Sequence, residues 1–230
     1  MGIAENVKKV KGNIEDAAIR AGVDPDSILL VAATKMNSAD RVREAIAAGI
    51  KICGENRVQE LLQKDAMGAY ENAEKHFIGH LQRNKVKNIV GLCELIQSVG
   101  SVELLELISK RAELIGIVQD ILIEVNIGYE EAKSGFLPEK LDEVVCLASG
   151  LKGIHIQGLM TIPPQCADPK QSVYYFDSMY KLFVDIGAKK YDNVSMKIMS
   201  MGMSGDYVEA IGAGANMVRV GTAIFGERHY

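Results

Sequence analysis

Short apolar runs alternate with amphipathic segments along the whole chain. Eight of these runs have the length of a buried strand, and each is followed by polar residues or glycine. They are SILLVAA (27–33), IKICG (50–54), HFIGH (76–80), ELIQSV (94–99), DILIEVNI (120–127), IHIQGLM (154–160), SMKIMSM (195–201) and NMVRVG (216–221). Because helical patterns separate them and no long antiparallel pattern is present, they predict parallel βαβ units.

Apolar residues at three- and four-residue spacing predict the helices. In residues 5–21 this spacing places Val7, Val10 and Ile14 on one face, and Gly22 follows as a typical helix end. We expect this N-terminal helix to be followed by helices over 38–48, 56–65, 83–90, 101–114, 138–148, 170–187 and 204–212.

Eight strand–helix units in 230 residues predict a closed (β/α)8 TIM barrel with an extra N-terminal helix. The alternative left open by the pattern is an open, doubly wound sheet. No composition shift or linker divides the chain, and the Pro-rich stretch TIPPQCADPK is too short for a domain boundary. Residues 1–230 are therefore expected to form one domain.

Composition and charge exclude several classes of function. The formal net charge is -4 and the basic residues are scattered, which does not favour nucleic-acid binding. The N-terminus lacks the apolar core of a signal peptide and no run approaches a membrane span, so a cytoplasmic protein is expected. The four cysteines lie far apart without metal-ligand spacing, which indicates reduced core thiols and no metal site.

The barrel prediction also says where function should lie. Active sites of this fold form at the carboxyl ends of the strands, so the residues that follow each apolar run are the candidates. They are Lys35, Glu55, Asn56, Arg57, His80, Ser98, Asn126, Met160, Thr161, Ser200, Ser204, Arg219, Val220, Gly221 and Thr222.

Two stretches have the composition of a phosphate site. SMGMSGD (200–206) and RVGTAIFG (219–226) supply hydroxyls and glycines next to predicted helices. Each stretch alone is typical of a connecting turn. Both, however, follow the seventh and eighth strands, where barrels often bind phosphate, and this coincidence favours an anion site.

Lys35 and Arg219 are the two cations with the most unusual sequence context. Lys35 ends an apolar run, so it is either a surface amine or a Schiff-base former at the barrel mouth. Arg219 lies inside the run MVRVG, where it forms either a structural ion pair or a ligand contact. Because arginine only donates hydrogen bonds, it would hold a pyridine nitrogen in its unprotonated form.

From about residue 5 to Gly226 the chain resembles the pyridoxal phosphate homeostasis proteins, relatives of the barrel domain of alanine racemase. The resemblance is carried by five stretches in order: LLVAATKMNSADRVREAIAAGIKICGENRVQELLQK, HFIGHLQRNKVK, VNIGYEEAKSGF, IQGLMTI and SMGMSGDYVEAIGAGANMVRVGTAIFG. It implies pyridoxal 5'-phosphate (PLP) as cofactor, held as a Schiff base on Lys35. The implied phosphate contacts are Ser200, Ser204, Gly221 and Thr222, the pyridine contact is Arg219, and the ring environment includes Asn56 and Met160.

The resemblance implies a role in PLP homeostasis, as a cofactor carrier or buffer that affects amino-acid and keto-acid balance. Racemases of the related fold use a second domain, for which the chain leaves no room, so we expect a binding protein without robust catalysis. A small racemase-type enzyme and a Schiff-base sugar-phosphate aldolase remain the alternatives. Expected partners are PLP and apo-enzymes that receive it, and a complete ring of helices predicts a monomer. Lys133, another amine near the mouth, is interpreted as a solvated loop residue.

One departure from the family pattern is visible. Family members commonly carry Asp after the Ser-Val at the end of the fourth strand, where this chain has Gly100. We expect Ser101 to cap the following helix instead.

Overall fold

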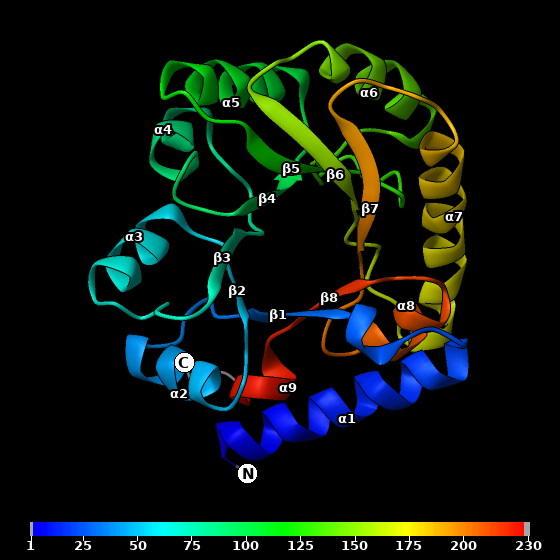
Figure 1. The fold of residues 1–230 in the computed structure, drawn as a ribbon. Coiled ribbons are helices and arrows are strands. Elements are labelled where there is room, and N and C mark those ends of the chain that lie inside the picture. Colours follow the sequence, from blue (N-terminus) through cyan, green and yellow to red (C-terminus); the bar gives the residue numbers. More distant parts are fainter. Residues whose placement is uncertain (1, 228–230) are drawn as a thin grey trace.

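The computed structural model describes residues 2–227, which form a closed barrel of eight parallel strands (Figure 1). Neighbours in the ring follow the sequence order, and β1 closes the ring by pairing with β8. The strands are β1 Leu29–Ala33, β2 Ile52–Glu55, β3 Glu74–Phe77, β4 Leu95–Val99, β5 Gln119–Glu124, β6 Ile154–Met160, β7 Val194–Ser200 and β8 Met217–Val220. The predicted barrel is confirmed, and the open sheet is wrong.

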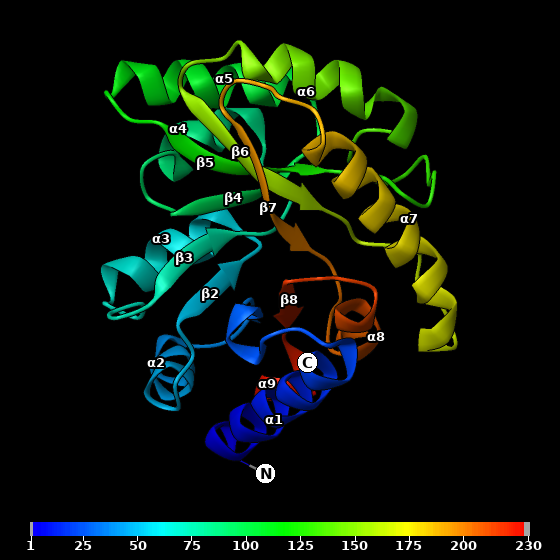
Figure 2. The same ribbon diagram turned by 45° about the vertical axis from the view of Figure 1, so that its right-hand side comes forward.

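Helices surround the strands on the outside of the ring (Figures 1 and 2). They are α1 Ile3–Ala21, α2 Ala39–Ala47, α3 Val58–Ala66, α4 Val86–Ile89, α5 Val102–Leu114, α6 Leu141–Ser149, α7 Pro169–Gly187, α8 Tyr207–Gly212 and α9 Thr222–Phe225, with short 3-10 turns at Pro25–Ser27, Arg83–Lys85 and Pro138–Lys140. The N-terminal helix α1 packs across α8 and α9. Gly22 caps its C-terminal end, as predicted.

Several element boundaries differ from the predictions. Strand β3 covers residues 74–77 rather than 76–80, because the chain turns at Gly79, where a side chain would lie 2.2 Å from the Asn56 carbonyl oxygen. The helix expected over 83–90 is a 3-10 turn followed by the single turn α4. Helices α3 and α8 begin two and three residues later than predicted, and the one-turn helix α9 was not predicted.

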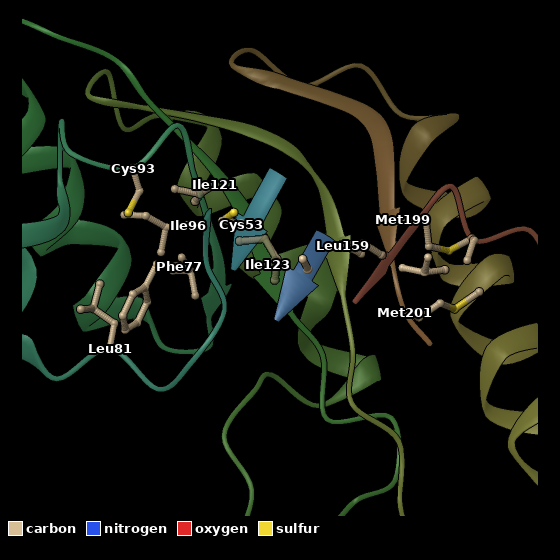
Figure 3. Close-up of a cluster of buried hydrophobic side chains, with 14 of the residues drawn as sticks. Cys53, Phe77, Leu81, Cys93, Ile96, Ile121, Ile123, Leu159, Met199 and Met201 are labelled. Carbon is tan, nitrogen blue, oxygen red and sulfur yellow. The ribbon is translucent and has the colours of Figure 1, made fainter. Parts of the chain in front are cut away.

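The core has an inner and an outer layer because successive strand residues point to opposite faces. On β1, Val31 belongs to the apolar cluster that fills the barrel, while Ala32 belongs to the cluster between the strands and helices. The inner cluster consists of Val31, Ile52, Leu95, Leu122, Met160 and Met217. Figure 3 shows part of the outer layer, with Phe77 beside Leu81 and Met199 near Met201. This double layer fixes which residues can reach the barrel mouth.

The start of α5 confirms the predicted helix cap. The Ser101 hydroxyl accepts a hydrogen bond of 3.2 Å from the Leu104 N–H. A side chain at Gly100 would lie 2.7 Å from the Gly135 nitrogen, so the loop after β5 leaves space only for glycine there. The departure at position 100 therefore matches the packing of this chain.

Two further features of the described residues concern ligands and membranes. No helix within 2–227 is both long and apolar enough to cross a bilayer. In the same part of the chain, His, Cys, Asp and Glu side chains do not gather in any group that could hold a metal ion.

The cap of α5 gives a stability prediction. Replacing Ser101 with Ala should lower the free energy of unfolding by about 1 kcal/mol, because the Leu104 N–H loses its partner at the first turn. Urea unfolding followed by circular dichroism measures this change. Ser101→Asp is the matched control, since a carboxylate also caps and should restore stability; equal stability of Ser101→Ala and the unaltered protein would contradict the cap.

Candidate functional site

Lys35 lies two residues after the end of β1. It is half-buried at the mouth of the barrel. It lines a cavity of about 350 Å³ together with residues that follow β8. The cavity is lined by Ala33, Lys35, Met36, Asn37, Arg41, Gly221, Thr222, Phe225, Gly226 and Glu227. Because β1 pairs with β8, the structure thus brings together three of the predicted site residues, Lys35, Gly221 and Thr222.

The loops after β7 and β8 meet beside this cavity. The Ser204 hydroxyl accepts hydrogen bonds from the Gly221 N–H at 3.0 Å and from the Ala223 N–H at 3.4 Å. The Arg219 N–H donates to the carbonyl oxygen of Gly202 at 3.0 Å. The two stretches that we interpreted as a phosphate site are therefore neighbours in space.

The donors at this junction fit a small anion. Thr222 is exposed at the start of α9, and a side chain at Gly221 would make only an ordinary contact of 3.4 Å with Ala33, so the backbone there is open. Gly205 has open space around its Cα, whereas Gly202 (φ +87°) packs against α8, with a hypothetical Cβ 2.5 Å from that of Ala210. Hydroxyls and backbone N–H groups are the donor set that phosphate prefers. The Gly221 N–H donates to Ser204 in this structure, so the hydroxyls of Ser204 and Thr222 are the donors that face an anion first.

Arg219 lies inside the barrel below the mouth and is only 4% exposed. Its guanidinium donates to the Ser200 hydroxyl at 2.5 Å and to the Thr161 carbonyl oxygen at 2.8 Å. Burial lowers the pKa of Arg219 to about 10, which still leaves it protonated at neutral pH, and the Glu124 carboxylate favours this charge. Arg219 is therefore a fixed cation with hydrogen-bond donors aimed into the barrel.

The sequence analysis placed Ser200 in a predicted phosphate-binding stretch, whereas in the structure its hydroxyl lies inside the barrel between Gln97 and Arg219. Its fully buried hydroxyl accepts from Arg219 and donates to Gln97 at 2.7 Å, and the Gln97 amide in turn reaches the His76 ring nitrogen Nδ1 at 2.9 Å. This chain of polar groups runs across the barrel interior. A phosphate contact from Ser200 stays a prediction, while its hydroxyl already has two partners.

Glu124, at the end of β5, is a buried carboxylate that the sequence analysis did not identify. Both of its oxygens accept from the Ser134 hydroxyl, at 3.1 and 3.0 Å. Burial raises the pKa of Glu124, and the Ser134 hydrogen bond and the charge of Arg219 oppose this shift. Glu124 thus provides the negative charge that faces Arg219 within the barrel.

Asn56 and Met160, the predicted ring-side residues, both lie at strand ends. Met160 is fully buried in the inner apolar cluster at the end of β6. Asn56 directly follows β2, and its amide oxygen Oδ1 is buried with no hydrogen-bond partner among the described residues. A buried amide oxygen of this kind fits a binding site in which the ligand supplies the hydrogen-bond donor.

His80 and Lys133 lie away from the cavity at Lys35. His80 is exposed and lines a second cavity of about 380 Å³, which Ser98 and Ser134 also border. Lys133 forms an ion pair with Glu130 on the loop after β5 and donates to the Pro163 carbonyl oxygen at 3.2 Å. Neither residue reaches the junction of β1 and β8.

A buried ion cluster behind β1 and β2 was also missed. The Lys64 amine contacts the Glu55 carboxylate at 2.6 Å, and the Tyr70 hydroxyl donates to the same oxygen at 2.9 Å. Burial, with Glu55 next, raises the pKa of Tyr70, and burial raises the pKa of Cys53 to about 12. Glu60 and Lys64 stand four residues apart in the sequence, and this helical spacing of opposite charges is the signal that could have indicated an ion pair here.

Comparison with known proteins agrees with this geometry. Residues 4–229 match the family model of the alanine racemase N-terminal domain. The chain is 42% identical, over 100% of both chains, to a pyridoxal phosphate homeostasis protein of Aquifex aeolicus. It is 37% identical to the protein of that name in Pseudomonas aeruginosa, with 99% of this chain and 96% of the relative covered.

Among solved structures, PipY of Synechococcus elongatus PCC7942, determined with PLP bound, is similar with a TM-score of 0.82 and 30% identity, over 97% of this chain and 100% of that one. The sequence resemblance is confirmed by these matches along the whole length. The chain belongs to the family of the pyridoxal phosphate homeostasis proteins, built on the alanine racemase N-terminal domain fold.

Proposed function

We propose that this chain binds PLP at the barrel mouth through Lys35 and acts in PLP homeostasis as a carrier of the cofactor. The observation that carries the proposal is the cavity that Lys35 shares with Gly221 and Thr222. It supports an arrangement in which one end of the ligand meets an amine and the other meets anion donors. The names of the relatives and the PLP bound to PipY support the same ligand.

The covalent step of this proposal is a simple condensation. The Lys35 amine would hold the aldehyde carbon of PLP through a carbon–nitrogen double bond, with one water molecule released for each PLP bound. The reaction needs no oxidant or second cofactor and reverses when water or another amine adds. Reversibility is what a carrier requires, because the aldehyde must leave again intact.

The phosphate and the pyridine ring have separate contacts in the proposal. The hydroxyls of Ser204 and Thr222 and the Gly221 backbone hold the phosphate, and Arg219 reaches the pyridine nitrogen. Ser200, also predicted to contact the phosphate, would have to exchange its hydrogen bond to Gln97 for one to the ligand. PLP supplies an electron sink when bound to enzymes. A guanidinium keeps the pyridine nitrogen unprotonated, which weakens that sink, so the proposal is a binding function that hands PLP to apo-enzymes.

Replacing Lys35 with Ala should abolish covalent binding, because this amine forms the only proposed bond to the aldehyde. The unaltered protein with added PLP should absorb in the visible range, and borohydride followed by peptide mapping should find a pyridoxyl group on Lys35. Lys133→Ala, which removes an amine outside the cavity, is the matched control and should keep both properties. A colourless unaltered protein without adduct would refute PLP binding at this site and favour a sugar-phosphate barrel.

Replacing Thr222 with Ala should weaken PLP binding by roughly tenfold, because one hydrogen bond to a charged phosphate is lost. Titration by absorbance with PLP and with pyridoxal, which lacks the phosphate, separates this contact from general damage. Affinity for pyridoxal should not change, and Thr222→Ser should bind PLP as the unaltered protein does. An equal loss for both ligands would show that Thr222 does not contact the phosphate.

The PLP-loaded protein should restore activity to an apo-aminotransferase and should not racemise free amino acids. The reason is that Arg219 disfavours carbanion formation on the cofactor. Proton exchange at Cα of alanine in deuterated water measures racemase-type chemistry, and alanine racemase serves as the positive control. Exchange that depends on Lys35 would overturn the carrier function in favour of a small racemase-type enzyme.

A further inference from the structure

The main chain on both sides of Lys35 is tied to helix α3 on the outside of the barrel. The Thr34 carbonyl oxygen accepts from the Lys64 amine at 2.8 Å. The Met36 N–H donates to the Glu60 carboxylate. Glu60 and Lys64 form an ion pair of 3.0 Å, so the two ties are part of one cluster.

The cluster is anchored by further buried groups. Glu55 Oε1 accepts from the Lys64 amine at 2.6 Å, from the Tyr70 hydroxyl at 2.9 Å and from the Thr34 hydroxyl at 2.6 Å. The side chains of Lys64 and Glu55 are 6% and 1% exposed. We call Glu55, Glu60, Lys64 and Tyr70 the α3 clamp. A buried network with this many bonds has little freedom to rearrange.

The clamp supports the backbone geometry at Met36 from outside the turn. Met36 adopts φ +62°, a left-handed conformation that residues with a side chain rarely adopt. This turn reverses the chain directly after Lys35, so that the Met36 N–H meets α3 on the outer side while Lys35 lines the cavity on the mouth. Two hydrogen bonds hold this conformation: the Asn37 N–H donates to the Thr34 carbonyl oxygen at 3.1 Å within the turn, and the Met36 N–H donates to Glu60 on α3.

Glu60 is also the member of the clamp that can be removed alone. Its side chain is 20% exposed, and Lys64 keeps Glu55 as its partner when Glu60 is absent. Loss of Glu55 or Lys64 would instead leave a buried charge without its ion pair, which destabilises the fold itself.

We infer that the α3 clamp positions the Lys35 amine for its ligand, and that Glu60 is the positioning residue through its bond to Met36. This inference rests on the proposed function, because it gives Lys35 the role of PLP-binding amine. Without the clamp the segment 34–36 would sample other conformations, and binding would have to select the productive one.

The test compares Glu60→Ala, which removes the acceptor, with Glu60→Gln, which keeps an amide oxygen for the Met36 N–H. Glu106→Ala, which removes an exposed glutamate of α5, is the matched control. For each variant, PLP titration gives the affinity, and visible circular dichroism per bound PLP reports how rigidly the ring is held. Thermal unfolding without PLP reports stability separately.

We expect Glu60→Ala to bind PLP roughly tenfold more weakly with a smaller dichroic signal per bound PLP, and Glu60→Gln to recover most of both. A structural role alone would lower the melting temperature without changing the dichroism per bound molecule, and that result would overturn the inference. Equal affinity and dichroism in all variants would overturn it too. If the unaltered protein forms no adduct on Lys35, the proposed function itself fails, which is a different outcome.

Discussion

Closure of the ring by pairing of β1 with β8 is the constraint on which the candidate site depends. The pairing sets Val31 beside Arg219 and carries the segments that follow the first and last strands to the same part of the rim. Lys35 follows the first strand and Thr222 follows the last, and they line one cavity for this reason alone. In an open, doubly wound sheet the first and last strands would not pair, and no such cavity would exist.

The alternation of side chains along β1 then divides the rim into two environments. Thr34 points outward and enters the buried ion cluster with Glu55, while Lys35 lines the cavity on the mouth. Lys35 therefore lies next to Thr34 in the sequence, yet its side chain does not share the surroundings of the buried ion cluster that Thr34 enters. The outer cluster fixes the backbone, and the inner face remains available for a ligand.

Sequence periodicity was sufficient for the eight strands and the longer helices, because strands and helices bury faces that repeat every two or every 3.6 residues. It did not predict the one-turn helix α9. It was insufficient where burial depends on distant partners. Lys64 has the pattern of a helix surface residue, and it is buried only because Glu55 and Thr34 come from other elements. Glu124 stands in an apolar run, and its environment is set by Ser134 and Arg219.

The candidate site was predictable in part for the same reason. The strand ends identified Lys35, Gly221 and Thr222, because the rim of a barrel collects whatever follows its strands. Ser200 also ends a strand, but inward orientation joins its hydroxyl to Gln97 and Arg219. The position of a residue just after a strand predicts that it lies at the rim of the barrel. The direction of its side chain decides whether it reaches the cavity or the barrel interior.

Arg219 connects the stability of the barrel with the chemistry that the site allows. Its guanidinium is held by Ser200 and Thr161, and Glu124 supplies the opposing charge. A cation fixed in this way does not have to reorganise when a hydrogen-bond acceptor of a ligand arrives. It also donates no proton, because even the lowered pKa of about 10 lies far above that of a pyridine. The group that completes the polar interior is therefore a fixed donor of hydrogen bonds that supplies no proton.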